Sequence, residues 1–118
     1  MEGKIIIKYR YLLDDGWVFY TLDEIESDNT VGSEILNHNY KARNQFTGIQ
    51  DKNGKDIYEG DIVKQMILDS NGDDSGYNFE KIVFEKGKFI VGNFDLFERS
   101  LEVIGNIHEN PELLKNID

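Results

Sequence analysis

An acidic run between residues 69 and 80 has the residue types of a calcium site. Carboxylates and an amide occupy the first, third, fifth and twelfth positions of EF-hand spacing. These residues are Asp69, Asn71, Asp73 and Glu80. The sixth position, where an EF-hand turns sharply at glycine, is Asp74. Its flanks are typical of strands. We therefore interpret residues 69–78 as a polar loop, and we predict no metal site.

Groups for nucleophilic catalysis are sparse. The chain has no cysteine, no Gly-x-Ser-x-Gly motif and only two histidines, His38 and His108. It also lacks a glycine-rich phosphate loop. Acids adjoin one another at Asp14 and Asp15, but neighbours on a strand point to opposite faces, so adjacency does not make a catalytic pair. We predict a protein that is not an enzyme, with no catalytic residues and no cofactor.

Basic and aromatic residues alternate near the N-terminus and could contact a partner. Lys8 and Arg10 flank Tyr9, and Trp17 follows a turn. Small β-domains often bind ligands through exposed aromatic rings, and rings beside cations can stack on single-stranded nucleic acid. Most rings are expected to fill the core, but Trp17 is predicted to be exposed. Lys8, Arg10 and Trp17 are therefore the candidate partner-binding residues.

The charge is strongly and unevenly acidic. The formal net charge is -10 at pH 7, from 23 acids and 13 bases. Residues 41–64 are near neutral, with four acids and five bases, and both flanks are acidic. Such a protein is repelled by phosphate backbones at long range, so nonspecific nucleic-acid binding is not expected. The acidity favours solubility; the alternative is an acidic decoy that occupies a nucleic-acid-binding protein.

Length and composition indicate one soluble domain. The 118 residues fit a single domain that spans the whole chain. The absence of cysteine excludes disulfides and thiolate zinc sites and suits a reducing cytoplasm. No apolar run is long enough to span a bilayer, and the first residues lack the pattern of a signal peptide. We expect a cytoplasmic protein.

Local patterns predict mostly strands. β-branched and aromatic residues dominate the apolar set, and only one proline is present. Strands are predicted over 5–11 and 17–22, joined as a hairpin by the turn Asp14-Asp15-Gly16. Thr21 and Glu24 have capping-box spacing, although few apolar residues follow. Residues 34–36 are interpreted as a short strand or a helical turn.

The central segment predicts a hairpin closed by glycine. Lys52-Asn53-Gly54 suits a type I turn that ends with glycine in the left-handed region. This longer loop sets Asp51 opposite Lys55, whereas a two-residue Asn-Gly loop would place like charges opposite each other twice. A second tight turn at Glu59-Gly60-Asp61 leads into a predicted strand over 62–68.

The C-terminal half predicts a second hairpin, a last strand and a helix. With Lys86-Gly87 at the tip of a hairpin over 80–92, Phe84 faces Phe89 and Ile82 faces Val91. A strand is predicted over 100–107. Asn110-Pro111-Glu112 is a helix start, because Asn caps and Pro is favoured at the first helical position.

Two segments resemble the YopX-like family of phage and prophage proteins. The first comprises Gln45–Ile49 with Asp51–Val63, and the second is Val103–Leu114. The opening Ile7-Lys8-Tyr9-Arg10-Tyr11 is similar to that family's basic-aromatic first strand, with Tyr11 where tryptophan is expected.

The resemblance implies a fold and an origin but no activity. It implies an SH3-like small β-barrel over residues 45–118, so residues 1–44 would be an N-terminal hairpin extension and the chain would end in a short helix. It also implies a phage or prophage origin and a bacterial cytoplasm. No established biochemical function accompanies the family, so it supplies no functional residue.

These observations favour a non-enzymatic accessory protein that binds a phage or host protein. A nucleic-acid-binding module that uses the Lys8 and Arg10 face is the alternative. Self-assembly is also open, because exposed strand edges can pair between copies.

Overall fold

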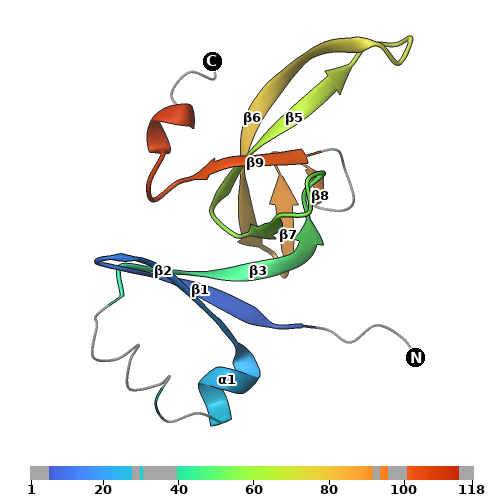
Figure 1. Cartoon of the computed structure of the whole chain (residues 1–118). Coiled ribbons are helices and arrows are strands. Elements are labelled where there is room, and N and C mark those ends of the chain that lie inside the picture. The colour runs from blue at the N-terminus through green and yellow to red at the C-terminus, as the bar shows by residue number, and fades with distance from the viewer. Residues whose placement is uncertain (1–5, 28–29, 31–39, 92–93, 96–100, 115–118) are drawn as a thin grey trace, which may run out of the picture. The chain divides into compact units, whose positions relative to one another are not determined.

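The protein is mainly β. The computed structural model describes residues 6–27, 30, 40–91, 94–95 and 101–114. Figure 1 shows the elements in chain order. They are β1 (Lys8–Leu13), β2 (Gly16–Thr21), α1 (Leu22–Ser27), β3 (Ala42–Gln50), β4 (Asp56–Tyr58), β5 (Asp61–Leu68), β6 (Asp74–Glu85), β7 (Lys88–Val91), β8 (Phe94–Asp95), β9 (Leu101–Asn106) and the 3-10 turn η1 (Pro111–Leu114). The predicted segment 34–36, His38 and Ile5 lie outside the described residues.

The chain divides into two compact units. The first covers residues 1–48 and the second residues 49–118. The division follows Gly48, whereas the sequence places it after Asn44. Strand β3 contributes to both units: its first part pairs with β1, and β4 is its other neighbour in a sheet of order β2-β1-β3-β4.

The N-terminal unit is built on the predicted hairpin. β1 and β2 pair antiparallel from Lys8 opposite Thr21 to Leu13 opposite Gly16. Gly16 has a φ of 130°, which a residue with a Cβ rarely adopts. Tyr11 and Leu13 form the buried centre of this unit. Half-buried apolar residues pack around them: Tyr9, Val18, Tyr20 and Ile25.

A capping box begins helix α1. The Glu24 carboxylate accepts a hydrogen bond from the Thr21 backbone N–H at 2.7 Å. In return, the Thr21 hydroxyl accepts one from the Glu24 N–H at 3.1 Å. The reciprocal pair satisfies two N–H groups that a helix start leaves free. The sequence pattern therefore marks a helix, and Leu22, which we expected to end a strand, is its first residue.

The glycine-closed turn of the second unit is confirmed. The Asp51 N–H donates to the Lys55 carbonyl at 2.7 Å, so these two residues close the loop as predicted. The Gly54 N–H donates to the Asp51 carbonyl at 3.0 Å, and Gly54 has a φ of 85°. The second predicted turn also forms, with Gly60 at a φ of 89°.

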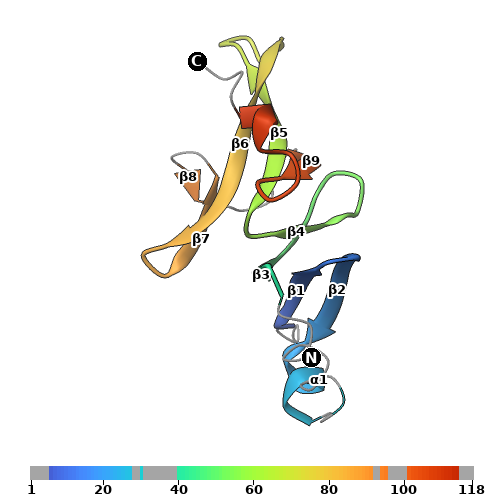
Figure 2. The same cartoon turned by 90° about the vertical axis from the view of Figure 1, so that its left-hand side faces the viewer.

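Strands β5 and β6 form a long hairpin whose outer part extends past β9 and β7 as a two-stranded ribbon (Figures 1 and 2). The predicted loop over 69–78 is wrong, because β6 begins at Asp74. Only residues 69–73 form the connection. The pairing of β5 with β6 shifts register by one residue between Met66 and Leu68, which marks a β-bulge or a similar irregularity: Met66 faces Tyr77, and Leu68 faces Asp74. The first residues of β6 are exposed to water and polar, so their composition indicated a loop and not a strand.

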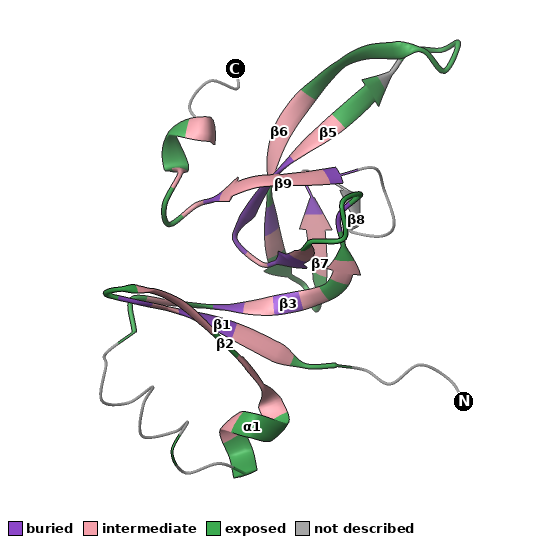
Figure 3. Cartoon of the chain, in the orientation of Figure 1, coloured by how far each residue is buried: buried purple, intermediate pink, exposed green. Residues whose placement is uncertain are grey.

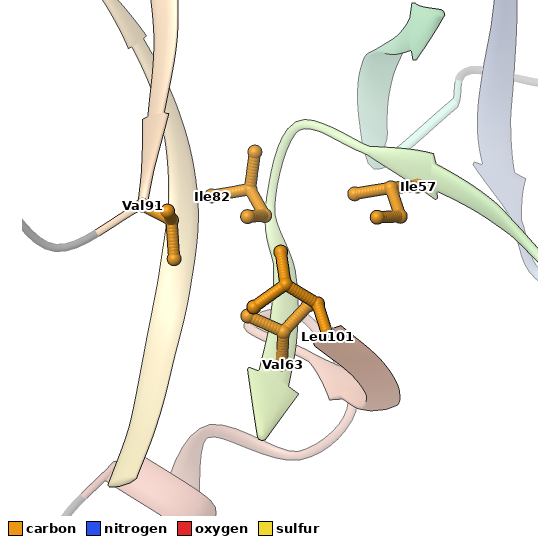
Figure 4. Packing of buried hydrophobic residues seen from close by; sticks show 5 residues of the cluster. All are labelled: Ile57, Val63, Ile82, Val91 and Leu101. Carbon is orange, nitrogen blue, oxygen red and sulfur yellow. The ribbon is translucent and has the colours of Figure 1, made fainter. Parts of the chain in front are cut away.

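Five aliphatic side chains form the core of the second unit. Figure 4 shows Ile57, Val63, Ile82, Val91 and Leu101 gathered from separate strands. The predicted pairs Ile82–Val91 and Phe84–Phe89 are both confirmed. Phe84 nevertheless remains 48% exposed, because it lies beyond the core toward the hairpin tip. The side of the β6–β7 hairpin that carries these two pairs is therefore apolar along its length, but it is buried only where it meets the core.

The described strands form two open antiparallel sheets. The second has the order β8-β7-β6-β5-β9, and no closed barrel is found among the described residues. The expected C-terminal helix is represented there by the single 3-10 turn η1. Asn110 accepts the Leu113 N–H through its backbone carbonyl at 3.1 Å. We expected the Asn110 side chain to cap this turn. Its oxygen instead accepts a hydrogen bond from the Asn106 N–H.

None of the helices in the described residues has the length and apolar character needed to cross a lipid bilayer.

Candidate interaction surfaces

The three candidate residues of the N-terminal unit lie on one face of its sheet. Opposite residues of paired strands share a face. Because Arg10 pairs with Phe19 and Leu12 pairs with Trp17, the side chains of Lys8, Arg10 and Trp17 alternate onto the same side. The structure therefore brings these three residues together.

Arg10 is held within this face. It is only 7% exposed, and its guanidinium carbon lies 4.4 Å from the centre of the Trp17 ring. Its Nε donates to the Asn44 Oδ1 at 3.1 Å. A guanidinium above an indole ring is a favourable cation–π arrangement. Trp17 is consequently half-buried, contrary to the expected exposure, and the exposed ring of this face is Phe19.

Lys8 has a similar aromatic contact. Its Nζ lies 4.6 Å from the centre of the Phe46 ring. Lys8 is half-buried, so part of this cation reaches the surface. Together with Phe19, which is 55% exposed, it gives the face a modest cationic and aromatic character.

The candidate calcium loop is a tight hairpin connection. The Asp69 carboxylate accepts hydrogen bonds from the N–H groups of Asn71 and Asp73, both at 2.9 Å. Glu80 lies away from this loop, within β6 and opposite Val63. Across the described residues, no group of three or more acids or histidines could hold a metal ion. The first acid of this run, Asp69, instead accepts hydrogen bonds from the backbone of its own turn.

A second surface, which sequence reasoning missed, lies on the ribbon of β5 and β6. Register places Lys64, Met66, Tyr77 and Phe79 on one side of the two strands. We call these four residues the ribbon face. The Tyr77 and Phe79 rings stack with centres 5.5 Å apart. The Lys64 Nζ lies 4.2 Å from the centre of the Tyr77 ring.

The ribbon face is unusually apolar for its exposure. Met66 is 42% exposed and Tyr77 54%. Ile67, which is 41% exposed, lies on the opposite side of the ribbon. Figure 3 shows the outer half of the ribbon as exposed. The alternation of Tyr77 and Phe79 with polar neighbours was the signal that could have revealed this strand.

Asp51 joins the two segments on which the family resemblance depends. One carboxylate oxygen accepts the N–H groups of Asn53 at 2.8 Å and Lys55 at 2.9 Å. The other accepts the Val103 N–H of β9 at 2.9 Å. Burial by itself would raise the pKa of Asp51. The hydrogen bonds from Val103, Lys55 and Asn53, together with the charge of Lys55, nevertheless hold this pKa below its ordinary value.

Further contacts connect the same two segments. The Lys52 N–H donates to the Leu101 carbonyl at 2.9 Å, and the Ile107 N–H donates to the Gly60 carbonyl at 2.9 Å. The Asp61 carboxylate, which is 1% exposed, accepts the Tyr58 N–H at 2.8 Å. These motif residues have a structural role, because each contact satisfies a backbone donor at a turn or a strand edge.

Residues 20–115 match the family described as YopX protein, and the chain therefore belongs to the YopX family. The chain is similar to a solved structure, the crystal structure of protein EF1440 from Enterococcus faecalis, with a TM-score of 0.55 and 25% sequence identity. The likeness covers 94% of this chain and 99% of the other. No curated protein matches.

Proposed function

We propose that the protein is a non-enzymatic protein-binding module, an accessory protein of a phage or prophage that acts in the bacterial cytoplasm. The single observation that carries the proposal is the exposed ribbon face. Family membership supports the proposed origin through the resemblance described above. An SH3-like fold for the second unit is part of the proposal, supported by the β5-β6-β7 meander and the return of β9 beside β5.

Exposure of this kind favours a protein partner. Aromatic residues and methionine are enriched in protein interfaces, where they supply large apolar area with few charges. Met66 and Tyr77 offer that chemistry side by side on two paired strands. Single exposed apolar residues need no explanation, but a group on one hairpin indicates an interaction site.

Capture from infected bacterial cells tests this proposal. A tagged wild-type chain should retain a reproducible protein partner, and a variant with Met66→Ser and Tyr77→Ser should lose it. Phe84→Ser is the matched control, because it removes an exposed aromatic residue from another hairpin of the same unit. Equal capture by all three proteins would show that the ribbon face is not the binding site.

Nucleic acid is a second candidate ligand. The observation that favours it is the convergence of Lys8, Arg10 and Trp17 on one face that also exposes Phe19. An exposed ring beside a cation could stack on a base, although the net charge of -10 opposes this binding. Gel shifts at low salt decide between the two candidates. Retardation of a single-stranded probe that Phe19→Ala and Lys8→Glu abolish would favour nucleic acid, and no retardation would exclude it.

A further inference from the structure

The chain contains the dipeptide Asn-Gly twice, and both copies lie in the same kind of turn. One is Asn53-Gly54, between β3 and β4, and the other is Asn71-Gly72, at the tip of the β5–β6 ribbon (Figure 1). Each asparagine follows an aspartate by two residues. We call residues 51–55 the Asp51 turn and residues 69–73 the Asp69 turn.

The two turns have the same internal hydrogen bonds. In each, the aspartate carboxylate accepts the N–H groups of the asparagine and of the residue after the glycine, at 2.8 and 2.9 Å in the Asp51 turn and at 2.9 Å for both in the Asp69 turn. The glycine N–H donates to the aspartate carbonyl, at 3.0 Å for Gly54 and 2.9 Å for Gly72. The two glycines have φ values of 85° and 84°. Local structure therefore does not distinguish the two asparagines.

An Asn-Gly dipeptide can modify itself without an enzyme. The backbone nitrogen of the glycine loses its proton to water or hydroxide and attacks the Cγ of the asparagine side chain. A C–N bond forms, the bond from Cγ to the amide nitrogen breaks, and that nitrogen takes up a proton and leaves as ammonia. Water then opens the cyclic imide to aspartate or isoaspartate, so the net reaction exchanges ammonia for water. Glycine favours the ring closure because it has no Cβ to hinder the close approach.

The folded turns restrain this reaction. The nitrogen that must attack is the one that donates to the aspartate carbonyl in each turn, so the turn has to open before the ring can close. Such opening is a local fluctuation, and its frequency depends on how firmly the rest of the fold holds the segment. The reactivity of each asparagine is therefore decided by the tertiary contacts of its turn.

Contacts with β9 hold the Asp51 turn but not the Asp69 turn. The Asp51 carboxylate accepts the Val103 N–H, and the Lys52 N–H donates to the Leu101 carbonyl, both at 2.9 Å. All residues of the Asp69 turn are exposed, as Figure 3 shows for the tip of the ribbon. Within the described part of the chain, their hydrogen bonds remain inside the turn. The Asp69 turn should therefore open more often.

We propose that Asn71 is a site of spontaneous deamidation in the folded protein and that it reacts ahead of Asn53. Each event replaces a neutral amide with a carboxylate, which adds negative charge beside Asp69 and Asp73. Isoaspartate also adds a methylene group to the backbone, so it disturbs the turn that joins β5 to β6. The inference goes beyond the proposed function and does not depend on it, because the reaction requires no partner.

Peptide mapping of the full-length protein tests the proposal. The chain is incubated at mildly alkaline pH, which favours loss of the glycine proton, and is digested at acidic pH, which stops the reaction. Mass spectrometry then follows the modified fraction at each position. Asn71 should react about tenfold faster than Asn53 or more, because two additional hydrogen bonds oppose opening of the Asp51 turn. In urea, where neither turn forms, the two rates should become similar.

Two substitutions connect the rates to the turns. Asp51→Asn weakens the hold of β9 on its turn and should accelerate the reaction of Asn53, whereas Asn71 in the same molecule should keep its rate. Asn71→Gln removes the faster site, because a glutamine side chain has to close a larger ring. It should delay the appearance of acidic species on ion exchange. Circular dichroism verifies that both variants are folded.

The wild-type comparison decides the proposal even if a substitution prevents folding. Equal rates at the two positions in the folded protein, or a faster reaction at Asn53, would overturn it. An Asn71 that stays intact in the folded protein while the chain in urea is fully modified would overturn it as well.

Discussion

At the scale of single residues, Asp51 shows how a charged side chain can stabilise a fold through hydrogen bonds to the backbone. Its carboxylate receives three backbone N–H groups, from two sides of a loop and from β9. The hydrogen bonds to the ionised form outweigh the cost of burial, so the pKa of Asp51 is lowered. A perturbed carboxylate often indicates catalysis, but structural hydrogen bonds also perturb carboxylates, and the three bonds to Asp51 all come from backbone N–H groups.

We predict that Asp51→Asn lowers the free energy of unfolding by about 1–3 kcal/mol at neutral pH, because one buried donor loses a charged acceptor. The folded-state pKa lies below the unfolded value of about 3.9. The stabilisation is therefore complete well above pH 4 and is lost as the pH falls through the folded-state value.

Urea unfolding at neutral pH and at several acidic values measures this effect. The difference between the wild type and Asp51→Asn should narrow below about pH 4. Asp15→Asn, at an exposed turn, is the control and should cost little. A difference that stays constant on acidification would contradict our account of Asp51.

At the scale of elements, turns and caps determine where strands and helices begin. Gly54 adopts a φ of 85°, and a Cβ built there would meet no atom within 4 Å. A substitution at this position therefore tests backbone conformation alone. Gly105 differs, because a Cβ there would lie 2.7 Å from the Asn110 Oδ1.

We expect Gly54→Ala to destabilise the protein by about 1–2 kcal/mol, because alanine is strained in the left-handed region. Gly54→Asn should cost less, since asparagine tolerates that region. Chemical denaturation of the two variants and the wild type gives the order directly. If the two substitutions lowered the free energy of unfolding equally, residue 54 would not adopt the left-handed conformation in solution.

The capping box permits a second test at this scale. Thr21→Ala should cost about 1 kcal/mol, because the Glu24 N–H loses its acceptor. Thr21→Ser keeps a hydroxyl, and Glu24→Gln keeps an oxygen acceptor, so both should remain close to the wild type. Amide chemical shifts of residues 22–27 would report the helix itself, and unchanged shifts in Thr21→Ala would rule out the cap.

At the scale of the whole molecule, the dominant quantity is the net charge of -10. On the described surface, one ion pair joins the Lys41 Nζ to Asp14 at 3.4 Å, with both side chains largely exposed. Exposed pairs of this kind contribute little to stability. Repulsion among the acidic charges, which outnumber the basic ones, acts against the compact state.

We predict that sodium chloride stabilises the protein modestly between low and physiological ionic strength, because salt screens this repulsion. A variant that combines Asp15→Asn with Asp73→Asn removes two exposed acids and should gain less from salt. Thermal unfolding at low protein concentration measures both proteins. A wild-type melting temperature that falls with added salt would show that attractive pairs dominate instead.

The sequence by itself determined the local structure wherever that structure depends on interactions between residues close together in the chain. The Thr21–Glu24 cap, the Gly54 turn and the pairing of Ile82 with Val91 all depend on neighbours in sequence or on hairpin register. Their conformations follow from sterics and alternation, which a linear chain displays. Family membership was likewise readable from residues 45–63 and 103–114.

Only the tertiary structure decided which residues are buried and which remain available. Arg10 and Trp17 look like a free binding pair in the sequence, but Asn44, 34 residues along the chain, completes an internal contact. Residues 74–78 look like loop, yet pairing with β5 makes them strand and exposes the ribbon face. Burial depends on contacts between distant segments, and those contacts outweigh the local propensity of each segment.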